Sequence, residues 1–348
     1  MISKRESTAI NIARLIFVFG VFIFHSPINI ESIGELENSK MPLYNILTSR
    51  FFMTDIPLQC LFFISGYLFF KPLRGGYLFG DYSKKIDRRI SSLLVPYIFW
   101  NVFWLIYEIF KEMHMGVYDG VLSCTDIFNV CYLFWMTGFG ENPDFPIAGY
   151  TWFIRDLFMF ALFSPIYFYC YKKRGLTLFI LIVMLVLSAF KNWHQPGMNT
   201  YLFLGGLFAF KGKSLEEAID KISWFVVVIL FLAINWLYYM VLNIDFVRLF
   251  LIVIAGLFII KLSFALTRFQ SISSFSTISM FLYVVHILVL NISRHTIIKF
   301  IHVKCDTDMC MYYFANTIIS LVICIISYYF LKFIKANRLL EVITGGRS

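Results

Sequence analysis

Charged residues are scarce in this sequence. Asp, Glu, Lys and Arg together make up 15% of the 348 residues, whereas an ordinary soluble domain has about a quarter. Hydrophobic residues reach 59% and aromatic residues 20%. This balance excludes an ordinary soluble enzyme and predicts an all-α, polytopic integral membrane protein. The length leaves room for about ten spans of roughly 20 residues with short connections, so we expect residues 1–348 to form a single membrane domain.

Several chemical motifs are also missing. The sequence contains no Walker loop, dinucleotide fingerprint, zinc motif or nucleophilic-serine elbow. Its seven cysteines are scattered, without the spacing of a zinc site or of a disulfide framework, so we expect no metal. Cys305 and Cys310 share one predicted loop and could pair if that loop faces an oxidising compartment.

The basic residues are dispersed in short connections. A net charge of +9 could suggest a nucleic-acid partner, but these residues form no continuous basic face, so we predict no nucleic acid. With the N-terminus inside, the predicted inner segments hold 20 Lys and Arg residues and the outer ones 8. The positive-inside rule therefore predicts that both termini are cytoplasmic.

Apolar runs predict ten membrane-spanning helices. Their approximate ranges are residues 8–25, 51–70, 90–110, 150–171, 175–190, 198–210, 223–242, 248–266, 275–293 and 311–332. Residues 71–89, the most basic connection, are interpreted as a cytosolic loop. Residues 127–136 are too few to span a bilayer, so they predict an interfacial or re-entrant piece.

The first of these helices buries two polar side chains, Arg14 and His25. An arginine near the centre of a membrane helix is disfavoured by roughly 2.5–3.5 kcal/mol. At about 100° per residue Arg14 and His25 lie on one face of the helix, together with Asn11. We therefore expect this stripe to face a protein interior or a wet cavity. His25 could act as a general base, since imidazole titrates near neutral pH, or it could be an interfacial histidine bound to a headgroup or water.

Two further helices carry polar candidates. His286 lies near the middle of the ninth predicted helix, one turn after Tyr283, and either takes part in catalysis or donates to a neighbouring helix. Arg155 and Asp156 lie inside the fourth helix. They could neutralise each other, but adjacent helix positions point to different faces, so we expect separate partners.

The candidates occur within an ordered set of motifs. The first helix has Arg14 and His25, and the second has the run FFISGY from Phe62 to Tyr67. Arg88-Arg89 and then Val-Pro-Tyr mark the third, Trp-Phe-Ile-Arg opens the fourth, and Tyr-Val-Val-His lies in the ninth. This set resembles the acyltransferase-3 family of bacterial integral-membrane acyltransferases. Members move an acyl group, usually acetyl from cytosolic acetyl-CoA, onto hydroxyls of surface polysaccharides, lipopolysaccharide or related glycans.

The resemblance implies an O-acyltransferase of the bacterial inner membrane, surrounded by membrane lipid, with acetyl-CoA as co-substrate and a glycan or glycolipid as acceptor. It places Arg14 and His25 at the reaction centre. It implies a donor-binding region made of Lys85, Arg88 and Arg89, with Ser65 and Gly66 in the helix packing around it. Two positions depart from the family pattern. Asn11 stands where an acidic residue often precedes the arginine, and Lys85-x-x-Arg88 followed by Arg89 replaces two arginines spaced two residues apart.

A mechanism follows from helix geometry. Arg14 and His25 are roughly 16 Å apart along the helix axis, too far to touch one carbonyl, so we interpret them as the two ends of a channel. Arg14 would steady the donor, and His25, or His286 in its place, would deprotonate the acceptor hydroxyl. Arg155 would offset charge on the oxyanion. The competing class is a transporter or flippase for a glycan or lipid, which would also need buried charges.

Overall fold

The computed structural model describes residues 2–27, 41–50, 56–73, 79–116, 121, 127–136, 145–188, 194–237, 245–301 and 303–346. These residues form helices and turns, with no strand among them, so the predicted all-α class is confirmed. The chain divides into two compact units. The larger unit contains residues 1–77 and 165–326, and the smaller contains residues 78–164 and 327–348.

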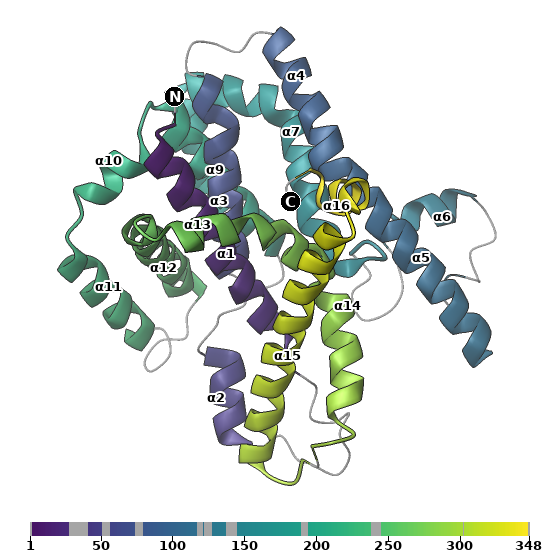
Figure 1. Ribbon diagram of the computed structural model, residues 1–348. Helices are drawn as coiled ribbons and strands as arrows, with labels where there is room; N and C mark the ends of the chain where they lie inside the picture. Colours follow the sequence, from purple (N-terminus) through teal and green to yellow (C-terminus); the bar gives the residue numbers. More distant parts are fainter. Residues whose placement is uncertain are drawn as a thin grey trace. The chain divides into compact units, whose positions relative to one another are not determined.

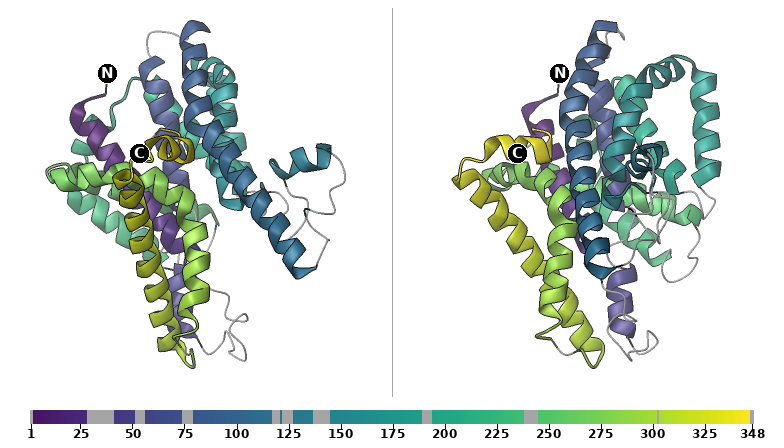
Figure 2. Two further views of the ribbon diagram at one scale, coloured as in Figure 1. Left: turned by 45° about the vertical axis from the view of Figure 1, so that its right-hand side comes forward. Right: turned by 90° about the vertical axis from the view of Figure 1, so that its right-hand side faces the viewer.

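The larger unit contains the first helix and most of the later ones. Its helices are α1 (Lys4–His25), α2 (Pro42–Arg50), α3 (Ile56–Phe70), α8 (Arg174–Ser188), α9 (His194–Phe210), α10 (Leu215–Asp220), α11 (Trp224–Trp236), α12 (Asp245–Leu266), α13 (Gln270–Phe275) and α14 (Ser279–Ile297), with 3-10 turns at Lys71–Leu73 and Ser276–Ile278. Helix α1 packs against α3, α12 and α14, as Figures 1 and 2 show.

The smaller unit is built around α5 (Val95–Met115). Its other helices are α4 (Phe79–Arg89), α6 (Ile127–Leu133) and α16 (Asn337–Thr344), with a π-helical turn at Ile90–Leu94 and a 3-10 turn at Gly149–Thr151. Two long helices, α7 (Trp152–Lys172) and α15 (Asp306–Phe333), begin in one unit and end in the other. Within the smaller unit the indole N–H of Trp100 donates to the Ile343 carbonyl at 3.2 Å, which holds α16 against α5.

Among the residues that the structure describes, six helical stretches are long and apolar enough to cross a membrane. They are Lys4–His25, Ile56–Leu73, Tyr82–Met115, Gly149–Lys172, Ser276–Ile297 and Asp306–Phe333. Four shorter apolar helices, Arg174–Val186, Asn199–Phe210, Trp224–Trp236 and Phe250–Leu266, coincide with the remaining predicted spans. Large apolar side chains such as Phe110, Phe225 and Leu232 are exposed on these helices, as expected for surfaces that face lipid. The chain is therefore a multi-pass membrane protein, and the exact count of ten spans stays a prediction.

Residues 79–89 correct one expectation. They form helix α4, which runs through the π-turn into α5, so the interpretation of residues 71–89 as a loop is wrong there. The reason is local: Lys and Arg are good helix formers, and residues 81–95 contain neither Pro nor Gly. Helix α6 has seven residues, too few to span a bilayer, and the interfacial or re-entrant placement of this piece stays a prediction.

Candidate functional site

The C-terminus of α1 presents His25, its last residue. The half-buried imidazole of His25 lies beside that of His286 from α14, with the ring centroids 5.1 Å apart. Residues separated by 261 positions in the chain thus form one histidine pair. The sequence offered His25 and His286 as alternatives, and the structure brings them together.

The tautomer of His286 is determined by its neighbour. The imidazole is 1% exposed, and its Nδ1 lies 2.6 Å from the Tyr283 carbonyl oxygen. A carbonyl oxygen can only accept, so Nδ1–H donates, and in the neutral ring Nε2 then carries the lone pair. His286 therefore contacts Tyr283, one turn earlier, through a hydrogen bond to the Tyr283 backbone carbonyl.

The last carbonyl groups of α1, which have no partner within the helix, are bound by side chains. Arg294 Nη2 donates to the carbonyl oxygens of His25 and Pro27, both at 3.1 Å. The Ser26 hydroxyl donates to the Phe22 carbonyl at 2.8 Å. A cation at a helix C-terminus also interacts favourably with the helix dipole. These bonds fix the backbone that carries His25.

A polar network between α14 and α15 supports this helix end. The Ser293 hydroxyl donates to Asn316 Oδ1 at 2.6 Å and also contacts Ser320. Asn316 Nδ2 donates to the Ser26 carbonyl at 3.4 Å, and the Tyr312 hydroxyl donates to the Arg294 carbonyl at 3.1 Å. Sequence reasoning missed these residues. The sequence feature that could have identified them is a polar side chain within an apolar helix, as at Asn316.

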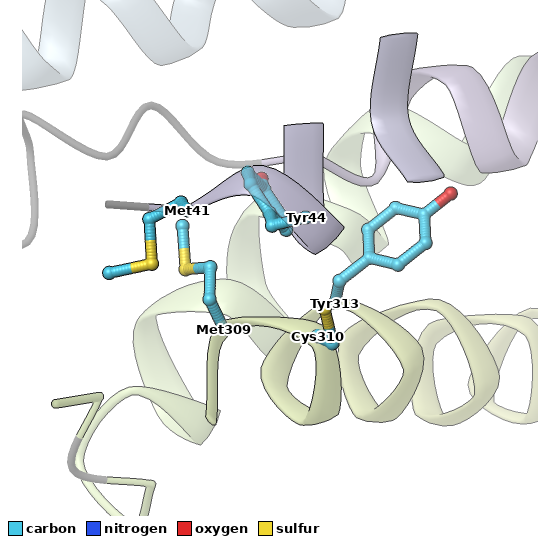
Figure 3. Packing of buried hydrophobic residues seen from close by; sticks show 5 residues of the cluster. All are labelled: Met41, Tyr44, Met309, Cys310 and Tyr313. Atoms are coloured by element: carbon cyan, nitrogen blue, oxygen red, sulfur yellow. The ribbon is translucent and has the colours of Figure 1, made fainter. Parts of the chain in front are cut away.

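A small apolar cluster lies next to the network (Figure 3). It consists of Met41, Tyr44, Met309, Cys310 and Tyr313, from the start of α2 and from α15. The rings of Tyr44 and Tyr313 pack edge to face, with centroids 6.1 Å apart. The Tyr313 hydroxyl donates to the Ile23 carbonyl of α1 at 3.4 Å. The cluster thus gives α15 a firm position against the end of α1.

Cys305 and Cys310 are both free. Cys310 is buried in the cluster on α15, whereas Cys305 is exposed and its Sγ lies 3.0 Å from the Thr307 hydroxyl oxygen. Helix α15 begins at Asp306, five residues before the predicted start. The Asp306 carboxylate accepts hydrogen bonds from the Leu43 and Tyr44 amides at the start of α2. The expectation that the two cysteines share one loop is therefore wrong.

Arg14 lies on the same helix as His25 but far from it. At 1.5 Å per residue the eleven positions between them span about 16 Å, so the two side chains are not brought together. Arg14 is half-buried, whereas Asn11 is exposed.

Glu6, near the other end of α1, is a buried carboxylate that sequence reasoning missed. It is 1% exposed. Its Oε1 accepts from the Tyr67 hydroxyl at 2.5 Å and from the Leu215 amide at 2.9 Å. These bonds join α1, α3 and α10. The acidic residue of the first helix is thus Glu6, at the helix start.

The packing of α3 against α9 uses glycines on both helices. A Cβ at Gly66 would overlap the Leu202 carbonyl oxygen, and a Cβ at Gly205 would lie 2.8 Å from the Phe63 carbonyl carbon. Gly66 of the FFISGY run therefore permits a close approach of α3 to α9. Ser65 is half-buried beside Gly66.

Arg155 lies in the smaller unit and is 5% exposed. Its Nε donates to Asp156 Oδ1 at 2.9 Å, and its Nη1 donates to the Trp135 carbonyl at 2.6 Å. The guanidinium also stacks over the Trp135 ring at 4.9 Å. The expectation of separate partners for Arg155 and Asp156 is wrong, because the long arginine side chain bends back to its neighbour.

The predicted donor-binding cations also lie in the smaller unit, on α4. Lys85 and Arg89 are half-buried, and Arg88 is exposed. Spacings of three and four residues bring Lys85 close to Arg88 and Arg89 on one side of the helix. Among the residues that the structure describes, no group of three or more His, Cys, Asp or Glu side chains could hold a metal ion.

Comparisons with known proteins agree with this architecture. Residues 7–329 match the family described as "Acyltransferase domain", acyltransferase-3. The succinoglycan biosynthesis protein ExoH of Rhizobium meliloti (strain 1021) is 29% identical over 164 residues. This alignment covers 46% of the chain and 42% of ExoH, so the chain spans less than half of that relative's length. No solved structure matches the chain. Because the family match extends over nearly the whole chain, the protein belongs to the acyltransferase-3 family.

Proposed function

We propose that this protein transfers an acyl group, specifically acetyl from cytosolic acetyl-CoA, to a hydroxyl of a surface polysaccharide or glycolipid. Membership of an acyltransferase family supports the reaction class. The observation that carries the proposal is the His25–His286 pair, which puts two imidazoles side by side at a fixed helix end. The relative ExoH is named a succinoglycan biosynthesis protein, which supports a polysaccharide acceptor.

In the proposed reaction His25 is the general base. It accepts the proton of the acceptor hydroxyl as the oxygen attacks the thioester carbonyl carbon. The new C–O bond forms, the C–S bond breaks, and the proton passes from His25 to the CoA thiolate. His286 packs against His25 and holds the direction of its ring.

The arginines are assigned supporting roles. Arg14 steadies the inner part of the donor, about 16 Å from His25 along α1, so a pantetheine arm would bridge the interval. Arg155, whose guanidinium is bound by Asp156 and Trp135, lies in the smaller unit, so its role at the oxyanion stays a prediction from the sequence. Lys85, Arg88 and Arg89 would hold the donor phosphates, since guanidinium groups bind phosphate in a bidentate manner.

Thiol release tests the reaction class directly. Purified protein should liberate free CoA thiol from acetyl-CoA only when a glycan acceptor is added, and mass spectrometry should find the acetylated glycan. A glycan transporter or flippase would release no thiol. Absence of release with every surface glycan of the source cell would contradict the proposal.

Replacement of Arg88 and Arg89 by Ala should weaken acetyl-CoA binding about tenfold or more, because charge-assisted hydrogen bonds contribute roughly 1.5–3 kcal/mol each. Isothermal titration with acetyl-CoA measures the change. Arg338→Ala, an exposed arginine on α16, is the matched control. Unchanged affinity in the double variant would move the donor site elsewhere, with Lys84 and Lys85 the next candidates.

Arg294→Ala should lower kcat about tenfold, since the end of α1 would lose two bonds that orient His25. As a positioning residue, Arg294 should leave KM for acetyl-CoA unchanged, and Arg294→Lys should restore part of kcat. Steady-state kinetics separates the two constants. A rise in KM with unchanged kcat would contradict the role.

We also propose that both termini and α4 are cytoplasmic, in the bacterial inner membrane. In a background without native cysteines, Ser83→Cys on α4 should stay unmodified by an impermeant maleimide in intact spheroplasts and react after lysis. Lys304→Cys, before α15, should react in intact spheroplasts. Labelling of the Ser83 variant from outside would overturn this topology.

A further inference from the structure

The larger unit contains a cavity that the proposed reaction does not use. Its volume is about 660 Å³, and it lies between α3, α9, α10 and α12. Small-molecule sites have volumes of roughly 300–1,000 Å³. Most of the wall is apolar, with lining side chains that include Phe63, Leu204, Leu207, Phe208, Ile252 and Leu257.

The cavity extends along the helices. Its wall on α12 runs from Ile252 to Ile260, which corresponds to about 12 Å of helix. Gly256 lies midway, where a Cβ would stand 2.7 Å from the Cys60 Sγ of α3. The apolar wall is therefore shorter than the ~30 Å hydrocarbon core of a bilayer. Its form and chemistry suit part of an acyl chain.

One end of the cavity is positively charged. Lys211, Lys213 and Lys221 line it, together with a single acidic side chain, Glu217. All three lysines lie in the segments that flank α10, after the end of α9.

The other acidic side chains of α10 are engaged elsewhere. Arg5 Nη1 forms ion pairs with Glu216 at 3.0 Å and with Asp220 at 2.9 Å. They therefore do not cancel the charge of the three lysines, which outnumber the single acid of the lining.

Buried cations hold this charged end in place. Lys71 Nζ donates to the Lys213 carbonyl at 2.8 Å. Lys261 Nζ, on α12, donates to the Ile219 and Ile222 carbonyls at 3.1 and 2.6 Å. The backbone that presents the lining lysines is thus fixed to α12 and to the end of α3.

From this geometry we propose that the cavity binds an anionic glycerophospholipid. An acyl chain lies along the apolar wall, and the phosphate group contacts Lys211 and Lys221. The acyl chain moves from the apolar interior of the bilayer into an apolar cavity, so its burial contributes little to the choice between lipids. Selectivity comes from the lysines, each of which raises the affinity for an anionic headgroup about fivefold. This site is additional to acyl transfer and does not rest on it.

Lipid binding by the purified full-length protein tests the proposal. The probes are phosphatidylglycerol and phosphatidylcholine, and native mass spectrometry measures the bound fraction. Wild-type protein should prefer phosphatidylglycerol. Lys211→Glu with Lys221→Glu should weaken the binding of phosphatidylglycerol at least 25-fold and that of phosphatidylcholine much less, because the choline cation offsets its phosphate charge. Lys299→Glu, at an exposed lysine outside the cavity, should change the binding of neither lipid.

A second variant tests the apolar wall. Leu257→Trp should reduce binding of both lipids tenfold or more by filling the cavity. Ile254→Trp is the control, on the same helix but outside the lining. If Leu257→Trp does not fold, the lysine variants decide the proposal. Equal phosphatidylglycerol binding by wild type and the lysine double variant would overturn it, and so would displacement of the lipid by stoichiometric CoA or inorganic phosphate.

Discussion

His25→Ala is expected to lower the rate of acyl transfer by 10²–10⁴-fold, the usual contribution of a general base. Removal of a polar side chain from an apolar helix does not hinder membrane insertion, and the bonds that hold the end of α1 involve backbone carbonyls that the variant retains. Thiol release from acetyl-CoA with glycan acceptor measures the rate, and fluorescence-detected gel filtration verifies the fold.

Two comparisons make this result specific. His295→Ala, an exposed histidine in the last turn of α14, should retain full activity. His286→Ala should reduce the rate less than His25→Ala, because His286 is assigned to orient its neighbour. A larger loss for His286→Ala would exchange the two roles. Near-wild-type activity of both variants would contradict the proposed site.

Gly205→Ala is expected to destabilise the larger unit by about 3 kcal/mol or more, at the upper end of overpacking effects. The added Cβ would meet the backbone of Phe63, with the carbonyl carbon 2.8 Å away. A backbone atom cannot move aside as the end of a side chain can, so α3 and α9 must separate. That separation would also disturb the glycine contact on the other side, where Gly66 faces Leu202.

Thermal melting in detergent, followed by gel filtration, measures the effect. We expect Gly205→Ala to be largely aggregated or to melt about 6–12 °C below wild type. Gly175→Ala, on α8, is the matched control. Apart from its chain neighbours and the nearby backbone of its own helix, no atom lies within 4 Å of the added Cβ. Equal melting temperatures for the Gly205 and Gly175 variants would show that α3 and α9 do not pack this closely.

Much of the architecture could be predicted from local chemistry. Long apolar runs specify membrane helices because every backbone polar group in lipid must be bonded within the segment, and each predicted span coincides with a helix. The ordered motifs led to the acyltransferase-3 family, which the match over residues 7–329 confirms.

Predictions from local sequence patterns were wrong where the reach of a long side chain or a contact with a distant segment determines the structure. Topology rules treat a basic segment as a loop, but residues 79–89 continue into α5 as helix α4. Helical periodicity predicts the direction in which a Cβ points, but not where the end of a long side chain lies. The guanidinium of Arg155 reaches back to Asp156. Arg294 was counted only as a charge in a loop, yet it binds the end of α1.

The sequence by itself determined the all-α membrane class, the polar residues that its apolar segments carry and the family to which the chain belongs. The tertiary structure alone decided that His25 and His286 meet, that Arg294 and Asn316 bind the backbone carbonyls of His25 and Ser26 where α1 ends, and that Glu6 joins α1 to α3 and α10. The physical reason is that hydrophobicity and helix propensity act over a few residues. Contacts between residues hundreds of positions apart depend on which helix faces pack together, and one sequence read in isolation does not specify that choice.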